Sequence, residues 1–302
     1  MARVTSTTTV GAAPGARRRR AEGAPLGPDS LLWRIAADGR CLMPGTAAGI
    51  LQLMHPGLGA GVTDHSAFFT EPWDRILRSI PQIWGTIFAP DDATADTRGR
   101  VVRDFHTDIK GVDHAGRRYH ALDPDVYWWA HATFTWEMFR ATELVMAPLT
   151  SDEKDQLYAE TVTWYRRYGV SERPVPADRA AFEDRFAEIC ADELERTPAA
   201  DWVFHMPDDE DAPKPPEAPL PTLVEPARPL LRWLRAENLR LMTYGSMPDV
   251  VRRRFDLPWN DADRAVFAGV CTTLRTLGAV AGPGLFDAFF PPGTPHGPPD
   301  QG

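Results

Sequence analysis

The sequence is poor in cysteine. Its 302 residues include only Cys41, Cys190 and Cys271, which are widely spaced and form no CxxC pair. A disulfide framework needs an even set of cysteines, and a thiolate zinc site needs pairs at short spacing. Neither is therefore expected as the basis of the fold, and we predict three buried thiols in a protein of the reducing cytoplasm.

Long apolar runs and an excess of positive charge are also missing. No stretch of 18 or more apolar residues occurs, so no membrane span is predicted. The net charge is −9, whereas binding to nucleic acid requires a basic face, so nucleic acid is not an expected partner. Residues 17–20 are four arginines. No apolar run follows them as an export signal requires, and we predict a disordered basic tail over residues 1–27.

Several catalytic motifs are absent from the sequence. It contains no GxGxxG, no P-loop, no HExxH and no ExxH. These absences argue against a nucleotide-binding loop, a zinc protease site and a carboxylate-bridged di-iron centre. Strands alternating with helices are missing too, which argues against a doubly wound sheet.

Helical patterns dominate what is present, so the predicted fold class is all-α. Clear start signals are an N-cap at Asp29 or Ser30, Asp123 before Pro124, the Thr150–Glu153 capping box and an N-cap at Asn260. We predict one multi-helix domain over residues 28–287, with an acidic, proline-rich insert over 205–221 and a disordered tail over 288–302.

Two local predictions concern the middle of the chain. A helix over residues 94–110 should carry His106 on its apolar stripe and end at Gly111. The pair Ala115–Gly116 predicts a tight turn between two short extended arms, and this is the one short β-hairpin expected. Further upstream, Pro56 should kink or end the helix that starts near Gly45.

Histidines are the most informative chemical groups. Four of the eight lie in apolar helical settings: His55, His65, His106 and His131. For each one taken alone, a core imidazole with satisfied hydrogen bonds is the default interpretation. A haem bound through one histidine makes the least demand on sequence pattern, because it needs one axial imidazole, an apolar sleeve and cations for two propionates.

Arginines and aromatic residues surround His106 in the sequence. The arginines are Arg75, Arg78, Arg100 and Arg103, and the aromatics include Phe68, Phe69, Trp73, Trp84, Phe88, Phe105, Trp128, Trp129, Phe134 and Trp136. They could form a haem pocket. They could equally form a solvated basic face and an ordinary hydrophobic core.

Three blocks carry a resemblance to a known family: ILQLMHPGLGAGVTDHSAFFTEPWDRILRS from residue 50, FHTDIKGVDHAGRRYHALDPDVYWWAHATF from residue 105 and PLTSDEKDQLYAETVTWYRRYGV from residue 148. Their ordered motifs, HP…DHS, RxxRS, HxxxxG, YxAxDP and WxHA, resemble the MpaB-type oxygenases and latex-clearing rubber oxygenases. The resemblance covers residues 28–200, weakens through 205–221 and returns in RRRFDLPWNDADR.

The resemblance implies an all-α fold that encloses a b-type haem, with His106 as the proximal iron ligand. Arg75 would lie near the haem, and Ser79 stands where the family usually has threonine. Arg78 stands where the rubber-cleaving branch has lysine. Arginine stays charged and is a poor iron ligand, which argues against rubber cleavage and against a lysine-closed distal site. His55, His65 and His131 match further family positions as cofactor-binding candidates.

The leading functional hypothesis is a haem-dependent oxygenase. Dioxygen would bind opposite His106, and a small hydrophobic organic substrate would enter an apolar cavity. Catalytic candidates are Arg75, Arg78 and Ser79, and an electron donor is a further candidate partner. Two alternatives stay open: a non-catalytic protein that binds haem or an apolar ligand, and a helical interaction domain without a cofactor.

Overall fold

The computed structural model describes residues 26–205, 237, 239–291 and 293–295. In order, its elements are α1 (Leu31–Ala36), η1 (Gly39–Leu42), α2 (Gly45–Leu53), α3 (Pro56–His65), η2 (Ala67–Phe69), α4 (Pro72–Gly85), α5 (Asp92–Asp104), β1 (Lys110–Val112), β2 (Arg118–His120), α6 (Pro124–Leu144), α7 (Ser151–Arg166), α8 (Arg179–Glu188), the π-helical turn η3 (Ile189–Glu193), α9 (Pro198–His205), α11 (Asp249–Arg254), α12 (Asp261–Ala281) and η6 (Pro283–Phe289). Within these residues the fold is helical apart from one two-stranded sheet, which confirms the predicted class.

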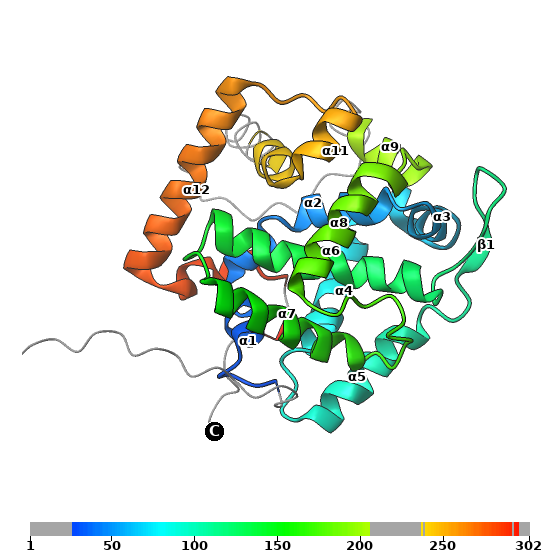
Figure 1. Cartoon of the computed structure of the whole chain (residues 1–302), viewed down its shortest axis with the longest axis horizontal. Helices are drawn as coiled ribbons and strands as arrows, with labels where there is room; N and C mark the ends of the chain where they lie inside the picture. The colour runs from blue at the N-terminus through cyan, green and yellow to red at the C-terminus, as the bar shows by residue number, and fades with distance from the viewer. Residues whose placement is uncertain (1–25, 206–236, 238, 292, 296–302) are drawn as a thin grey trace, which may run out of the picture.

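Helix α6 forms the centre of the molecule (Figure 1). It buries side chains on most sides, as a helix enclosed by other elements does. It packs against α2, η1 and α7. The Trp129 indole donates to the carbonyl of Leu51 at 3.0 Å, and the Gln52 amide donates to the Thr133 hydroxyl at 2.8 Å. These bonds satisfy polar atoms inside the apolar α2–α6 contact.

The predicted helix starts are confirmed. The Ser30 side chain accepts from the Trp33 amide, and the Asp123 side chain caps α6 ahead of Pro124. Capping boxes begin α7 at Thr150–Glu153 and α12 at Asn260–Asp263. α2 ends at Leu53 and α3 begins at Pro56, as the proline predicted. Local chemistry therefore determines where these helices begin.

The prediction of one helix over residues 94–110 was wrong at its end. α5 stops at Asp104, His106 lies in the turn that follows, and Gly111 belongs to β1 rather than to a helix cap. The reason is the hairpin, because Lys110, Gly111 and Val112 pair with β2 and cannot also be helical. The hairpin itself was predicted, and Gly116 in its turn has a φ of +81°, which favours glycine.

The three cysteines are buried and free, as expected. The tail over residues 1–27 and the insert over 205–221 lie outside the described residues except for Leu26, Gly27 and His205. None of the helices that the structure describes is both long and apolar enough to cross a membrane.

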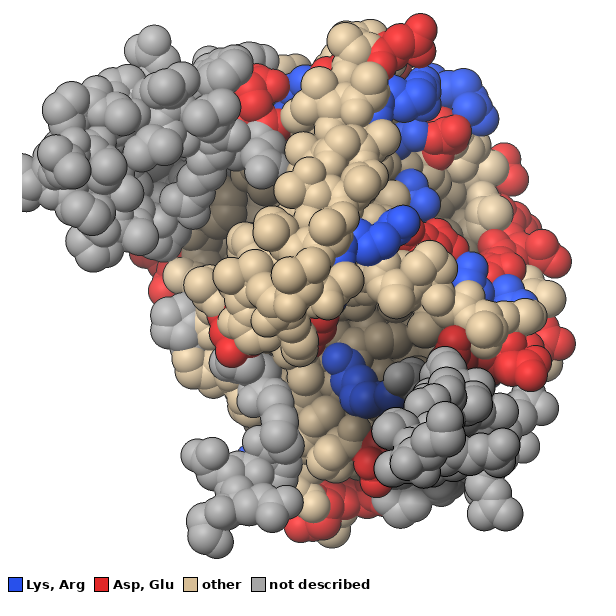
Figure 2. All heavy atoms as spheres, turned by 90° about the vertical axis from the view of Figure 1, so that its left-hand side faces the viewer, with Lys and Arg blue, Asp and Glu red and all other residues tan. Residues whose placement is uncertain are grey.

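Helix α12 lies at the edge of the molecule, and Figure 2 looks onto it and shows a band of uncharged side chains. Val266, Leu277 and Val280 are exposed on this helix, while its residues Phe267 and Cys271 are buried on the opposite face. α12 therefore contributes to the core through its inner face alone.

One buried carboxyl interrupts the α2–α6 contact. Glu137 is only 2% exposed, and its Oε1 has no hydrogen-bond partner among the described residues. A Cβ on Gly45, at the start of α2, would lie 3.0 Å from this oxygen. Burial raises the pKa of Glu137 to about 8, because the charged form loses its hydration.

We expect the stability of the protein to depend on pH because of Glu137. Its folded pKa lies above the unfolded value near 4.5. The folded state therefore holds the proton longer, and stability falls as pH rises from about 4.5 to about 8. Glu137→Gln should remove that loss and gain on the order of 4 kcal/mol over the wild type at pH 8.5. Urea unfolding at pH 5 and pH 8.5 measures the difference.

The matched control for this prediction is Glu143→Gln on the same helix. Glu143 is exposed and pairs with Lys154 at 2.8 Å, and such a pair contributes at most about 1 kcal/mol. The stability of Glu143→Gln should therefore change with pH as that of the wild type does. If the free energy of unfolding changed equally with pH in the wild type and in Glu137→Gln, Glu137 would not be a buried carboxyl with a raised pKa.

Candidate functional site

His106 is held by the turn after α5. Its Nδ1 lies 2.8 Å from the carbonyl oxygen of Val102, one helical turn earlier. A carbonyl can only accept, so Nδ1 carries the hydrogen and donates it. The other nitrogen, Nε2, is then an acceptor with a free lone pair, and no described residue bonds it. This is the tautomer that a metal-binding histidine uses.

The surroundings of His106 keep its ring neutral. The side chain is half-buried, and its pKa is lowered, first by burial and further by the positive charge of Arg75. The bond to the Val102 carbonyl acts in the opposite direction but is the smaller effect. A neutral imidazole is the form that binds a metal.

Arg75 is the cation whose charge acts on this ring, and it comes from α4. It is half-buried, and its guanidinium lies over the Phe68 ring at 5.6 Å from the centroid. Burial lowers its pKa. No carboxylate among the described residues pairs with it, and a partly buried cation without a counter-ion is costly, so an anionic group placed beside it would be stabilised.

The other two candidates on α4, Ser79 and Arg78, differ in their exposure. Ser79 lies one turn after Arg75 and is half-buried, so it shares that side of the helix. Arg78 is exposed and pairs with Asp74 at 2.8 Å. Arg75 and His106 are therefore brought together, Ser79 lies on the same side of α4, and Arg78 is held at the surface.

An aromatic cluster extends inward from His106. Tyr127 of α6 meets the His106 ring edge-on, with centroids 5.8 Å apart, and it contacts Tyr168 at 5.5 Å. Tyr168 in turn lies 6.0 Å from His131. His131 is thus one layer behind the His106 site and is separated from it by tyrosine rings.

His131 is enclosed by aromatic side chains. Its Nε2 lies 3.0 Å from the Thr161 carbonyl, and its Nδ1 has no described partner. A cavity of about 10 Å³ adjoins it, which is close to the space that one water needs. Burial lowers the pKa of His131 to about 3, so the ring is neutral and fits a structural role inside the core.

His55 and His65 lie at the start and the end of α3. His55 is the N-cap of α3, stacks on Trp129 at 6.3 Å and has its pKa lowered to about 4, chiefly by burial. His65 is exposed, and its Nε2 lies 3.2 Å from the Lys110 carbonyl. Neither has a described contact with His106.

Tyr127 is the site residue that the sequence did not single out. Its spacing of four residues from His131 on a helix could have indicated a shared face. Burial raises the pKa of Tyr127 well above its usual value. The hydroxyl therefore stays protonated and available as a hydrogen-bond donor beside His106.

The arrangement suits a cofactor that needs one protein ligand. Nowhere in the described part of the chain do three or more histidine, cysteine or carboxylate side chains gather as a metal site. His106 supplies one neutral nitrogen, and Arg75 supplies one cation that no described carboxylate pairs with, while the rings of Phe68 and Tyr127 pack against Arg75 and His106 respectively. An iron porphyrin with propionate groups matches this set of donors.

Comparison with known proteins adds one finding. A family model described as "ER-bound oxygenase mpaB/B'/Rubber oxygenase, catalytic domain" matches residues 33–276. The matched range runs from α1 into α12 and contains every candidate site residue. No curated protein and no solved structure gives a significant match.

Proposed function

Because the chain belongs to the family of mpaB and rubber oxygenase catalytic domains, we propose that it is a haem-dependent oxygenase that acts on a small hydrophobic organic molecule. The family supports oxygenase activity. The finer proposal, a b-type haem on His106, rests above all on the neutral ring whose Nε2 is left free by the bond from Nδ1 to Val102.

Each residue near His106 has a definite part in this proposal. His106 would bind iron through Nε2, and Arg75 would pair with a propionate. Phe68 and Tyr127 would line the apolar side, and Ser79 would donate a hydrogen bond close to Arg75. The haem supplies the oxidation of the substrate by dioxygen, while the chain supplies binding, orientation and exclusion of water.

Arg78, which stands where the rubber-cleaving branch has lysine, limits which residues could hold the iron. Arg78 is exposed and paired with Asp74, and a guanidinium does not give up its proton to become a metal ligand. Arg78 is therefore not proposed as a second metal ligand, and His106 is the one residue that would hold the iron.

The purified protein tests the proposal directly. We expect an intense haem absorption band and about one haem per chain, by analogy with single-ligand haem proteins. A panel of hydrophobic substrates with dioxygen and a reductant should give an oxygenated product. Product without haem would sink the cofactor assignment. Haem without any product would favour the alternative, a non-catalytic haem-binding protein.

A further inference from the structure

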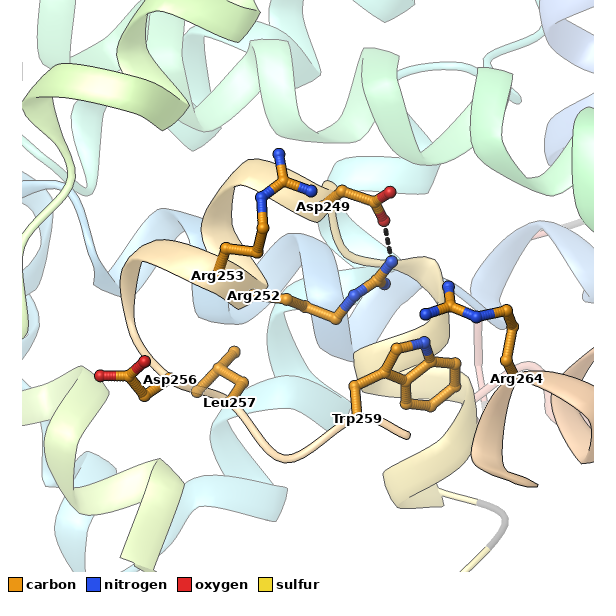
Figure 3. Close-up of a pocket in the computed structure, with 7 residues that line it drawn as sticks. All are labelled: Asp249, Arg252, Arg253, Asp256, Leu257, Trp259 and Arg264. Carbon is orange, nitrogen blue, oxygen red and sulfur yellow. Dashed lines mark hydrogen bonds and ion pairs between the residues drawn. The ribbon is translucent and has the colours of Figure 1, made fainter. Parts of the chain in front are cut away.

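A second cavity lies between α11 and the start of α12. Its volume is about 440 Å³, and Asp249, Arg252, Arg253, Trp259 and Arg264 are among the residues that line it (Figure 3). In Figure 1, α11 and α5 lie at opposite ends of the view, so this cavity is separate from the His106 site. Nothing in the proposed oxygenase function uses it.

Trp259 places an unpaired donor beside this cavity. Its Nε1 is buried and has no acceptor among the described residues. Figure 3 draws this nitrogen on the side of the ring toward Arg252 and Arg264. Guanidinium groups have no acceptor atom, so neither arginine can satisfy the indole hydrogen. The missing partner must be an acceptor, and leaving it out costs free energy.

Arg252 is the fixed part of the site. It is buried, ion-paired with Asp249, and donates to the carbonyls of Tyr244 and Met247, the latter at 2.8 Å. Its guanidinium lies over the Trp259 ring at 5.2 Å from the centroid. These contacts use its donors and lock the indole in place, so Arg252 orients Trp259 and is not the group that binds a ligand.

Arg253 and Arg264 bring positive charge that is poorly neutralised. Arg253 is exposed and has no carboxylate partner in the described residues. Arg264 has a single partner, Asp261, at 3.7 Å, and both are exposed, so that pair is weak. The cavity lining contains three arginines and two aspartates, Asp249 and Asp256. Asp249 is already paired with Arg252, so Arg253 and Arg264 are balanced in the lining by Asp256 alone, and the lining keeps a net charge of +1 on a chain of net charge −9.

We propose that this cavity binds the phosphate group of a small phosphorylated organic molecule, held by the Trp259 indole and the guanidinium group of Arg264, which lie side by side in Figure 3, while Arg253 adds positive charge to the lining from farther away. The guanidinium fork of Arg264 offers two donors and the indole offers a third, which matches the three terminal oxygens of a phosphate better than the two oxygens of a carboxylate. The volume of about 440 Å³ leaves room for an organic group beside the phosphate.

Calorimetric titration of the full-length protein tests this proposal with three probes. Glycerol 3-phosphate should bind with a dissociation constant below about 1 mM, and the affinity should fall as salt rises. Inorganic phosphate should bind more weakly, because it lacks the organic group. Equal or tighter binding of inorganic phosphate, or tighter binding of glycerate, would overturn the proposal, and so would the absence of saturable binding.

Variants locate the binding. Trp259→Phe keeps the ring and removes the donor, and Arg264→Gln removes one guanidinium; each should weaken glycerol 3-phosphate binding by about tenfold. Arg166→Gln is the control, because Arg166 pairs with Glu172 on the exposed surface of α7, and it should bind as the wild type does. Circular dichroism checks that each variant is folded. Wild-type affinity in a folded Trp259→Phe, Arg264→Gln double variant would exclude this cavity.

The indole signal gives a second, independent readout. Trp259→Phe identifies the Trp259 Nε1–H resonance among the ten tryptophans in a ¹H–¹⁵N spectrum. Glycerol 3-phosphate should shift that resonance in the wild type at the concentrations that saturate calorimetry, because the hydrogen gains an acceptor. A saturated protein in which this resonance does not move would contradict the role given to Trp259.

Discussion

Replacing His106 with alanine is expected to lower the haem content of the purified protein by at least about tenfold, since loss of even a supporting group around a metal ligand costs that much. The ring is the neutral, carbonyl-bound imidazole of this site, and its Nε2 is the nitrogen proposed to hold iron. Haem content per chain and the absorption spectrum measure the effect.

The matched control is His65→Ala. His65 is also a histidine and a cofactor candidate. It is exposed, however, and its Nε2 is already within hydrogen-bond distance of the Lys110 carbonyl. Haem content should stay unchanged in this variant. Added imidazole should partly restore the absorption band of His106→Ala, because it supplies the missing nitrogen. Undiminished haem and an unaltered spectrum in His106→Ala would refute the assignment.

Helix starts could be predicted from the sequence because the signals act over three or four residues. Ser30, the Thr150–Glu153 box and Asn260 each bond to a backbone amide within that distance. The end of α5 could not be predicted in the same way. It depends on Gly111 pairing with Tyr119, and a hairpin contact between two strands overrides the local tendency to continue the helix.

The candidate site could be predicted from the sequence only in part. Family motifs indicated Arg75 and His106, which the structure brings together across 31 positions of sequence. Arg78 is exposed and pairs with Asp74, and their spacing of four residues on an amphipathic helix is a signal that the sequence does contain. Tyr127 enters through the packing of α6 against the turn after α5, a tertiary contact with no local signature.

Gly99→Ala is expected to destabilise the protein by about 2 kcal/mol, through overpacking. Gly99 lies on α5 and is buried against the end of α7. A Cβ there would overlap the carbonyl oxygen of Arg167 and lie 3.1 Å from the amide nitrogen of Tyr168. Both are backbone atoms, so relief requires α5 to move rather than a side chain to rotate. Urea unfolding measures the loss.

Gly269→Ala provides the control, because an added Cβ at this exposed position of α12 meets nothing within 4 Å. Alanine favours a helix over glycine by about 1 kcal/mol, so this variant should be as stable as the wild type or more stable. Equal stability of Gly99→Ala and Gly269→Ala would contradict the close contact between α5 and α7.

Gly99→Ala also tests how the packing of α5 affects the proposed cofactor site. Val102, whose carbonyl accepts from His106, lies three residues after Gly99 on α5. A displacement of α5 away from α7 therefore moves the acceptor that fixes the His106 tautomer. We expect folded Gly99→Ala to retain haem less tightly than the wild type, by about tenfold, as for other groups that orient a metal ligand. Transfer of haem to an excess of apomyoglobin measures this, and unchanged transfer rates would show that α5 can shift without disturbing His106.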